Sequence, residues 1–294
     1  MTVLITGAGG FVGTHLANHL LSQGHQVVAL VRSVKNSRVL KKYKSDQFRT
    51  VIADLSLPIK LDFSVSSIVH LAAQIVYPNI TETEFAERNI ITMANTIRLA
   101  ESLEVKKFIF LSSISVYGKP GADTLTEISP FVTPSGYGTS KYLSELMLSD
   151  LKKKVSVTNI RIPSIIGKAA NPNFITKISE SALNSEELII QNPNTFFNST
   201  IHVNDISSLI SELLSKNTDP SFDTFNLACK DPVQLINLVR LIIDKLSSKS
   251  KIIINDTPTI SSTISIRKLL DEYQYTPMSV SCAIDKFLKE FQNI

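Results

Sequence analysis

The chain has 294 residues, of which 43% are hydrophobic and 19% charged, which is typical of globular proteins with one large core or two smaller ones. Its longest apolar runs fall far short of the roughly 20 residues that a membrane helix needs, and a strand-like run begins at Thr2 in place of a basic and apolar leader. We therefore expect a cytoplasmic protein with no membrane partner. The net charge of +4 is modest, and the basic clusters Lys41–Lys44 and Lys152–Lys154 lack the stripe or motif of a nucleic-acid binder, so no nucleic acid partner is expected.

Cysteine and histidine are too sparse to predict a metal site. Cys229 and Cys282 lie far apart in sequence, and both are expected to be small buried hydrophobic residues. His15 and His19 share a helix face at a spacing that metal ligands use, but no third ligand accompanies them. We therefore expect no bound metal.

The first 160 residues alternate short β-branched runs with longer helical stretches, which is the pattern of parallel βαβ units. The predicted strands, in chain order, are Thr2–Thr6, Gln26–Val31, Arg49–Ile52, Ser67–His70, Lys107–Leu111 and Val155–Arg161. The predicted helices between them are Phe11–Gln23, Glu82–Leu103 and Tyr137–Leu151. This pattern predicts an α/β fold with a Rossmann-type doubly wound parallel sheet, which binds ligands beyond the carboxyl ends of its strands.

After Arg161 the pattern loosens, and proline, asparagine and serine separate the helical runs. These runs are predicted near Asp205–Lys216, Pro232–Leu246 and Ser281–Phe291. We interpret residues 1–163 as a dinucleotide-binding Rossmann domain. Residues 164–294 then form a smaller, mixed substrate-binding region, with some segments returning to the Rossmann core. The stretch Lys119–Gly136, rich in proline and glycine, is predicted to be a long loop.

A glycine-rich turn lies between the first predicted strand and the first predicted helix. From Gly7 to Gly13 it reads Gly-Ala-Gly-Gly-Phe-Val-Gly. Backbone N–H groups and the positive end of a helix meet at such a turn, which makes it a natural pyrophosphate site. We expect Gly7, Gly10, Phe11, Val12 and Gly13 to contact the cofactor there.

The end of the second predicted strand indicates which dinucleotide is bound. An acidic residue at this place holds the ribose 2′-hydroxyl of NAD, whereas arginine accommodates the 2′-phosphate of NADP. The strand runs into Arg32, and no carboxylate follows until Asp46. Arg32 therefore favours NADP, and NAD stays possible if Arg32 only stacks on the adenine.

Tyr137 and Lys141 are spaced for proton transfer. Tyrosine has a reference pKa of about 10, so it is a weak acid near neutral pH unless a positive charge stabilises its phenolate. Lysine four residues later supplies that charge, because positions i and i+4 lie on the same face of a helix. Together with a dinucleotide turn, the pair predicts hydride transfer coupled to proton transfer.

The motifs resemble the extended branch of the short-chain dehydrogenase/reductase family, which includes enzymes similar to NAD-dependent epimerases and dehydratases of nucleotide sugars. The glycine spacing is Gly-x-x-Gly-x-x-Gly, as in that branch. Seven further segments follow in family order across most of the chain: Asp54-Leu55, His70–Ala73, Asn89, Ser112–Gly118, Tyr137 with Lys141, Arg161–Gly167 and Ile201–Asp205.

The resemblance implies roles for individual residues. Ser113, just after the fifth predicted strand, matches the catalytic hydroxyl that works with Tyr137 and Lys141, and both of these also contact the cofactor. The remaining cofactor residues that it implies are Asp54, Leu55, Leu71, Ala72, Ala73 and Pro163. The sugar pocket is lined in the family at the positions of Gln74, Ser113 and Ser164.

Two residues after Ser113 narrow the reaction class. In dehydratases of this branch these positions carry Asp and Glu, and in sugar-acid decarboxylases the second carries Glu; here they are Ile114 and Ser115. Without an additional acid or base, carbonyl reduction and 4-epimerisation remain. Asn198 stands where nucleotide-sugar epimerases often have a diphosphate-binding arginine, so other cations hold the phosphates or the substrate is not a nucleotide sugar.

These features predict an NADP-preferring oxidoreductase that reduces the 4-keto group of a nucleotide-activated deoxysugar. A nucleotide-sugar 4-epimerase is the alternative, and a dinucleotide-sensing protein without catalysis is a third. The sugar itself is not identified. By analogy with the family, the predicted helices Glu82–Leu103 and Tyr137–Leu151 pair across a homodimer.

Overall fold

The computed structural model describes residues 1–33, 46–74, 80–119, 121–217, 219–255 and 261–292. The basic cluster Lys41–Lys44 lies outside these residues. The chain folds into two compact units. The first comprises Met1–Lys119, Pro130–Arg161 and Ile206–Phe225, and the second comprises Pro120–Ser129, Ile162–Asp205 and Asn226–Ile294. A functional division between residues 163 and 164 stays a prediction.

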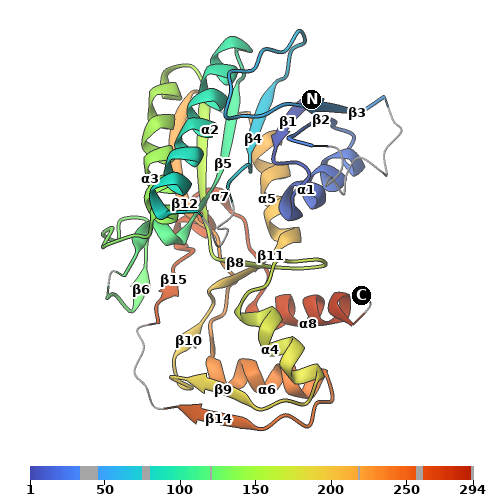
Figure 1. Ribbon diagram of the computed structural model, residues 1–294, viewed down its shortest axis with the longest axis vertical. Coiled ribbons are helices and arrows are strands. Elements are labelled where there is room, and N and C mark those ends of the chain that lie inside the picture. Colours follow the sequence, from blue (N-terminus) through green and yellow to red (C-terminus); the bar gives the residue numbers. More distant parts are fainter. Residues whose placement is uncertain (34–45, 75–79, 120, 218, 256–260, 293–294) are drawn as a thin grey trace. The chain divides into compact units, whose positions relative to one another are not determined.

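The first unit is built on a seven-stranded sheet of strand order β12-β7-β5-β4-β1-β2-β3 (Figure 1). Its strands are β1 (Thr2–Thr6), β2 (Gln26–Val31), β3 (Phe48–Ile52), β4 (Ser67–His70), β5 (Lys107–Ser113), β7 (Ser156–Ile162) and β12 (Ser221–Asn226). β1 pairs in parallel with β2 and β4, β2 with β3, and β4 with β5. The strand order reverses between β1 and β4, so the predicted Rossmann-type sheet is confirmed.

Strands β1, β2 and β4 have the predicted bounds, but β5 is longer than predicted. It continues two residues past Leu111, and Ser113 has the extended angles φ −146° and ψ 148°. The prediction that Ser113 follows the strand is therefore wrong, because Ser113 is its last residue. β12 was not expected. Phe222 and Phe225 are its only apolar residues, and they do not alternate with polar residues as they would in a typical strand.

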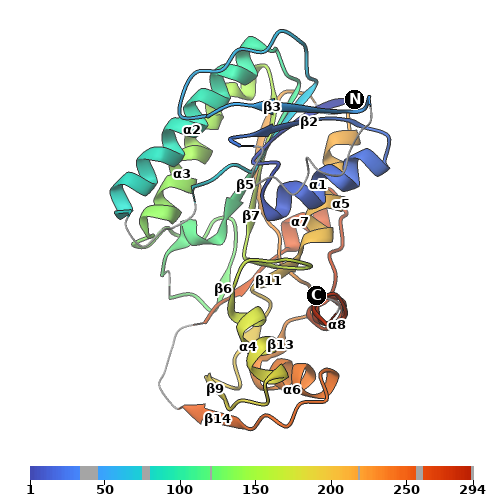
Figure 2. The ribbon, with the colours of Figure 1, turned by 45° about the vertical axis from the view of Figure 1, so that its right-hand side comes forward.

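Helices cover both faces of this sheet. α2 (Glu82–Ser102) and α3 (Gly136–Leu148) lie side by side on one face, and α1 (Phe11–Ser22) and α5 (Val203–Ser215) lie on the other (Figures 1 and 2). The hydroxyl of Ser135 caps α3 by accepting a hydrogen bond from the N–H of Gly138 at 3.2 Å, so the helix begins one residue earlier than predicted. Beyond Leu148 it tightens into a 3₁₀ turn, Ser149–Lys153.

The core of the first unit lies between the sheet and α2 with α3. Leu4, Ile68 and Phe108 from the strands are completely buried, as is Met93 from α2. Burying one such side chain contributes about 1.5–3 kcal/mol, so this layer fixes α2 and α3 against the strands that carry the site.

The second unit has short strands, and its helices are joined by loops. Its strands are β6 (Thr124–Leu125), β8 (Ser164–Ile166), β9 (Leu188–Gln191), β10 (Phe196–Phe197), β11 (Thr200–His202), β13 (Val233–Gln234), β14 (Ile252–Asn255) and β15 (Thr263–Ile264). Its helices are α4 (Phe174–Leu183), α6 (Leu235–Lys245), α7 (Arg267–Tyr273) and α8 (Val280–Phe291). The pairs β8–β11, β9–β14 and β6–β15 are parallel, and β10–β13 is antiparallel.

Three predictions for this region need correction. Lys119–Gly136 is not wholly a loop, because it contains β6. The helix predicted from Pro232 begins at Leu235, since the two residues before Leu235 form β13. α4 and α7 were not expected, although the capping box that Asn173 makes with Thr176 is a readable start signal for α4. No helix in the described ranges is long and apolar enough to cross a membrane.

Candidate functional site

The turn after β1 is packed too closely for side chains. Gly7 adopts φ +65°, and a Cβ atom there would lie 2.8 Å from the backbone nitrogen of Ala72. A Cβ atom at Gly13 would lie 2.6 Å from the Cα of Ala8 and closer still to the carbonyl oxygen of Gly7. Glycine is therefore required at both positions, and α1 begins tight against the turn.

The start of α1 is open to an anion. Gly10 is the N-cap residue, no side chain caps the helix, and the N–H of Gly10 donates to the carbonyl oxygen of Gly7 at 3.0 Å. Phe11, Val12 and Gly13 form the first turn, where N–H groups have no helical acceptor and the helix dipole is positive. This cradle of glycines and N–H donors fits the pyrophosphate of a dinucleotide.

The carboxyl ends of β2 and β3 place Arg32 near Asp54, and both side chains are exposed. The N–H of Ser56 donates to Asp54 Oδ1 at 2.9 Å; this hydrogen bond, then one with the Ser56 side chain and last the charge of Arg32 lower the pKa of the carboxyl group. Leu55 is buried, and its carbonyl oxygen accepts from Asn95 Nδ2 at 2.9 Å. At the carboxyl ends of β2 and β3, the positive charge of Arg32 therefore lies beside a loop that hydrogen bonds hold in place.

Thr6 fixes the loop after β4. Its hydroxyl accepts from the N–H groups of Leu71 and Ala72, both at 3.2 Å, and lies 2.9 Å from Nδ1 of His70. Because both lone pairs of the hydroxyl are used, its hydrogen points to Nδ1, and His70 carries its proton on Nε2. Burial, together with the charge of Lys141, lowers the pKa of His70 to about 3, so the ring stays neutral and shapes the loop.

A chain of hydrogen bonds joins the end of this loop to α3. Ala73 is exposed, and the N–H of Gln74 donates to Asn89 Oδ1 at 2.8 Å. Asn89 Nδ2 then donates to Ser140 Oγ at 3.2 Å, and Ser140 Oγ donates to the carbonyl oxygen of Tyr137 at 2.8 Å. Asn89 therefore supports the first turn of α3, where Tyr137 lies.

The structure brings the three predicted catalytic side chains together where β5 ends beside α3. Ser113 is hydrogen-bonded to Tyr137. Lys141 is 5% exposed, and its Nζ donates to the carbonyl oxygen of Leu111 at 2.7 Å. The same Nζ lies 5.8 Å from the centroid of the Tyr137 ring and 4.6 Å from that of Phe110. The ammonium group of Lys141, the phenol of Tyr137 and the hydroxyl of Ser113 thus lie close together.

Burial sets the protonation states of this cluster. It raises the pKa of Tyr137, and the hydrogen bond with Ser113 opposes that rise in part, so the phenol keeps its proton at neutral pH. Burial also lowers the pKa of Lys141 to about 8, against the opposing charge of Glu145. Lys141 is therefore a cation at neutral pH and loses its charge as the pH rises through about 8.

Two buried charges of this region were not predicted as site residues. Glu145 lies one helical turn after Lys141 and is 3% exposed, and Arg161 of β7 is 5% exposed. Arg161 Nη2 lies 2.7 Å from Glu145 Oε2. No signal for this pair is present in the sequence, since the burial of β7 along its whole length, which makes an arginine there need a partner, is seen only in the structure.

The second unit contains the remaining predicted residues. Pro163 is buried, whereas Ser164 is exposed and its carbonyl oxygen accepts from Thr200 Oγ1 at 3.3 Å. Asn198 is buried, and its amide is occupied by the backbone: Nδ2 donates to the carbonyl oxygen of Ile264 at 2.8 Å, and Oδ1 accepts from the N–H of Ile264 at 2.8 Å. Asn198 therefore binds β15 and is not directed at a ligand.

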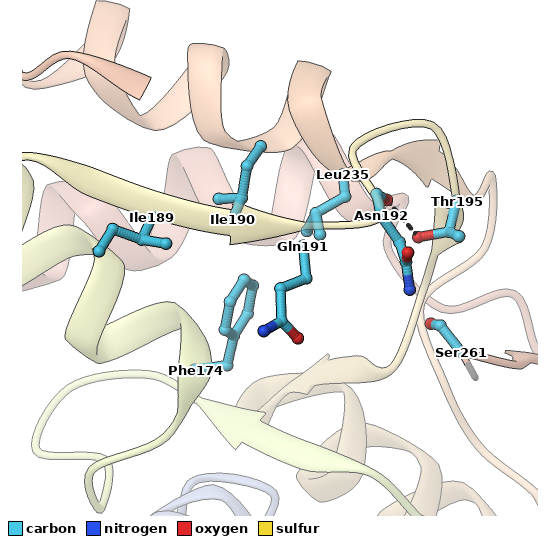
Figure 3. Close-up of a pocket in the computed structure, with 8 residues that line it drawn as sticks. All are labelled: Phe174, Ile189, Ile190, Gln191, Asn192, Thr195, Leu235 and Ser261. Atoms are coloured by element: carbon cyan, nitrogen blue, oxygen red, sulfur yellow. Dashed lines mark hydrogen bonds between the residues drawn. The ribbon is translucent and has the colours of Figure 1, made fainter. Parts of the chain in front are cut away.

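A pocket of about 280 Å³ also lies within the second unit (Figure 3). Its walls are aromatic, aliphatic and polar: Phe174, Ile189, Ile190, Gln191, Asn192, Thr195, Leu235 and Ser261. Thr195 Oγ1 donates to the carbonyl oxygen of Asn192 at 2.8 Å, which fixes the polar end. The volume suits one ring of a ligand better than a whole nucleotide sugar.

The structure corrects one of the two cysteine predictions. Cys229 is buried, and burial raises the pKa of its thiol, whereas Cys282 is exposed. Cys282 lies in the first turn of α8, on the side that does not pack inward. In the described part of the chain, no three side chains of His, Cys, Asp or Glu are placed to hold a metal.

Comparison with known proteins identifies the family. Residues 3–228 match the model of the NAD dependent epimerase/dehydratase family. The chain belongs to this family. The match covers the glycine turn, the Tyr137 and Lys141 pair, and Asn198, so the predicted resemblance to the extended short-chain branch is confirmed.

Individual known proteins are also similar to much of the chain. Protein CapI of Staphylococcus aureus is 25% identical over 287 residues, which is 85% of each protein. UDP-glucose 4-epimerase of Yersinia enterocolitica is 34% identical over 186 residues, or 57% of this chain and 54% of the relative. The enzyme WbmG of Bordetella bronchiseptica, solved in complex with NAD, superposes with a TM-score of 0.84 at 18% identity, covering 100% of this chain and 94% of WbmG. This last likeness shows the fold.

Proposed function

We propose that this protein is an NADP-preferring oxidoreductase that reduces the 4-keto group of a nucleotide-activated deoxysugar. The cluster of Ser113, Tyr137 and Lys141 carries the proposal. It places a protonated phenol, a hydroxyl and a buried cation at the end of β5, beside the carboxyl edge where a Rossmann sheet binds its ligands. Family membership supports an enzyme that uses a nicotinamide cofactor.

The side chains of this cluster perform the proton half of the reaction. When bound, the cofactor supplies a hydride to the carbonyl carbon. Tyr137 donates its proton to the carbonyl oxygen, which thereby becomes a hydroxyl, and Ser113 hydrogen-bonds that oxygen as charge develops on it. Lys141 stabilises the phenolate that remains until a solvent proton restores the phenol. The raised pKa of Tyr137 suits reduction of the carbonyl, because the phenol still holds the proton that it donates at neutral pH.

The cofactor would be held at the carboxyl edge of the first unit. In this proposal its pyrophosphate lies on the turn formed by Gly7, Gly10, Phe11, Val12 and Gly13. Asp54 and Leu55 border the adenine, Leu71, Ala72 and Ala73 line its path, and Pro163 and Lys141 adjoin the nicotinamide side. The preference for NADP rests on Arg32, an exposed cation at the end of β2 that suits a 2′-phosphate.

A 4-epimerase is the second candidate, and the relatives favour it. Proteins named UDP-glucose 4-epimerase from Yersinia enterocolitica and Neisseria meningitidis are 34% and 32% identical to about half of this chain. An epimerase returns the hydride that it removes, so it turns over without net consumption of NADPH. The same three side chains would serve, but Tyr137 would have to start as a phenolate to take a proton and then return it, so its raised pKa favours the reductase.

The substrate would contact both predicted sugar residues, Gln74 and Ser164, besides Ser113. Because Asn198 is occupied by the backbone of Ile264, it offers nothing to a diphosphate. In a nucleotide sugar the phosphates would instead be held by other cations, of which Lys168 and Lys177 are the candidates.

A homodimer is also proposed, with α2 and α3 in the interface. Ile91, Leu143 and Leu146 on these helices are 38%, 37% and 48% exposed, so this helix pair offers apolar side chains that an interface would cover. Sedimentation velocity would give a dimer mass if the proposal is correct. A monomer at micromolar concentration would contradict it.

One assay separates the candidates. Purified protein is mixed with NADPH or NADH and a panel of nucleoside diphosphate 4-keto-6-deoxysugars, UDP-glucose and simple ketones, and the NADPH absorbance band is followed. A reductase consumes NADPH in proportion to the keto-sugar added and prefers it to NADH. Interconversion of UDP-sugars without net NADPH loss would establish the epimerase, and a clear preference for NADH would contradict the role of Arg32.

A further inference from the structure

A buried ion pair lies one helical turn beyond Lys141, outside the groups that touch substrate in the proposed reaction. Arg161 Nε donates to Glu145 Oε1 at 3.0 Å and Nη2 donates to Oε2 at 2.7 Å, so the contact is two-pronged. Arg161 Nη1 also donates to the hydroxyl of Tyr117 at 3.0 Å, and Ser112 Oγ donates to Glu145 Oε1 at 2.5 Å. The carboxylate of Glu145 therefore has a single, fixed position.

This carboxylate belongs to the same contact between β5 and α3 as the catalytic cluster. Tyr137, Lys141 and Glu145 follow one another at intervals of four residues, so they share one face of α3. Each meets one of three successive residues at the end of β5. The three contacts are Leu111 with Lys141, Ser112 with Glu145, and Ser113 with Tyr137. A shift of any one contact would move the other two.

The charges around Lys141 come from three elements. His70 of β4 is neutral, because burial and the charge of Lys141 lower its pKa to about 3. Tyr137 of α3 is a protonated phenol, and Arg161 of β7 is paired with Glu145. Among the charged groups in the described ranges, Glu145 is the one whose field favours the proton on Lys141 against the cost of burial.

We propose that Glu145 is a positioning residue for catalysis, whose carboxylate, fixed by Arg161 and Ser112, keeps Lys141 in place and in the cationic form that Tyr137 needs. This inference rests on the proposed function of Tyr137 and Lys141. The competing explanation is a purely structural ion pair, since buried pairs often serve only to join elements.

The variant Glu145→Gln tests the inference, because it keeps the shape of the side chain and removes its charge. The pKa of Lys141 should then fall by about one unit, as expected for loss of one nearby opposite charge. The alkaline limb of the pH profile of kcat/KM for NADPH-dependent reduction should move to lower pH by the same amount. An alkaline limb at the wild-type pH in folded Glu145→Gln protein would overturn the proposal.

Ser144→Ala is the matched control for disturbance of the helix. Ser144 is buried on α3 and donates to the carbonyl oxygen of Ser140 at 2.8 Å, without carrying charge. Its removal should leave the alkaline limb in place. If the limb moved as far in Ser144→Ala as in Glu145→Gln, a general effect of packing would explain the result and the proposal would fail.

Two further measurements keep the test decisive. If Glu145→Gln does not fold, the double variant Glu145→Gln, Arg161→Met removes both buried charges. The alkaline limb of its pH profile should move to lower pH, by a smaller amount than expected for Glu145→Gln. The second measurement does not require enzyme turnover. Protein labelled with ¹³Cε-lysine is titrated by NMR, and the resonance that is missing from the spectrum of Lys141→Met is assigned to Lys141. If no substrate is turned over, the proposed function fails and the catalytic role of Glu145 fails with it; a lower midpoint of this resonance in Glu145→Gln would then show only that Glu145 keeps Lys141 cationic. An unchanged midpoint rejects the role of Glu145 even in an active enzyme.

Discussion

Replacing Gly13 by alanine should separate cofactor binding from folding. A Cβ atom at Gly13 would lie 2.6 Å from the Cα of Ala8 and nearer to the carbonyl oxygen of Gly7, whereas ordinary contacts begin at 3.4 Å. These are backbone atoms, so the turn and the start of α1 must move apart by about 1 Å, a displacement that can reduce a positioned interaction by about 10²-fold. We expect the Kd for NADPH to rise by at least tenfold. Overpacking of this kind also costs about 1–3 kcal/mol of stability.

Gly24→Ala is the matched control for the stability effect. Gly24 lies beyond the C-terminus of α1 at φ +78°, and a Cβ atom there would meet nothing within 4 Å. Alanine at such an angle costs about 1–2 kcal/mol, so the two variants should unfold at similarly reduced urea concentrations. Only Gly13→Ala should lose affinity for NADPH. The affinity is measured from the change in the fluorescence of the NADPH nicotinamide as the protein is titrated. Wild-type affinity in Gly13→Ala, or equal losses in both variants, would refute the placement of the pyrophosphate on this turn.

Three other substitutions have definite expected outcomes. Arg32→Ser should raise the Kd for NADPH about tenfold or more, because a charge-assisted hydrogen bond contributes about 1.5–3 kcal/mol, and leave the Kd for NADH unchanged; equal losses for both cofactors would argue against a 2′-phosphate contact. Lys141→Met should lower the reduction rate about 10²-fold, in the range of lost acid–base assistance, and a loss below tenfold would count against the mechanism. Asn198→Ala should lower the free energy of unfolding in urea by about 1–3 kcal/mol, because it leaves the backbone of Ile264 without its buried partner, and should not change NADPH affinity. An unaltered unfolding midpoint would show that Asn198 does not hold β15.

The sequence predicted the parts of the fold that local patterns determine. β1, β2 and β4 each contain an apolar run that is bounded by polar residues or glycine, and their bounds are those predicted. The glycine turn and the spacing of Tyr137 and Lys141 were also readable, because each is a short motif on a single element. By contrast, β12 pairs with a strand more than 60 residues away in sequence and has almost no apolar pattern, so only the folded sheet reveals it.

The same limit explains which parts of the candidate site were missed. Glu145 and Arg161 lie 16 residues apart on a helix and a strand, and nothing local tells that both are buried and paired. Asn198 could be recognised as replacing a family arginine, but its bonds to Ile264, 66 residues away, follow only from tertiary structure. His70 begins one of the family segments, but its hydrogen bond to Thr6, 64 residues away, follows only from tertiary structure.

In the proposed reaction, Tyr137 supplies the proton when a hydride reaches the substrate carbonyl. This role of Tyr137 is tested most directly by single-turnover reduction of a nucleotide-activated 4-keto-6-deoxysugar by NADPH, with wild-type protein and Tyr137→Phe compared at saturating ligand. Tyr137→Phe should bind NADPH normally and reduce the sugar at least about 10²-fold more slowly, which is in the range that one general acid contributes. Reduction by Tyr137→Phe at the wild-type rate would contradict this role.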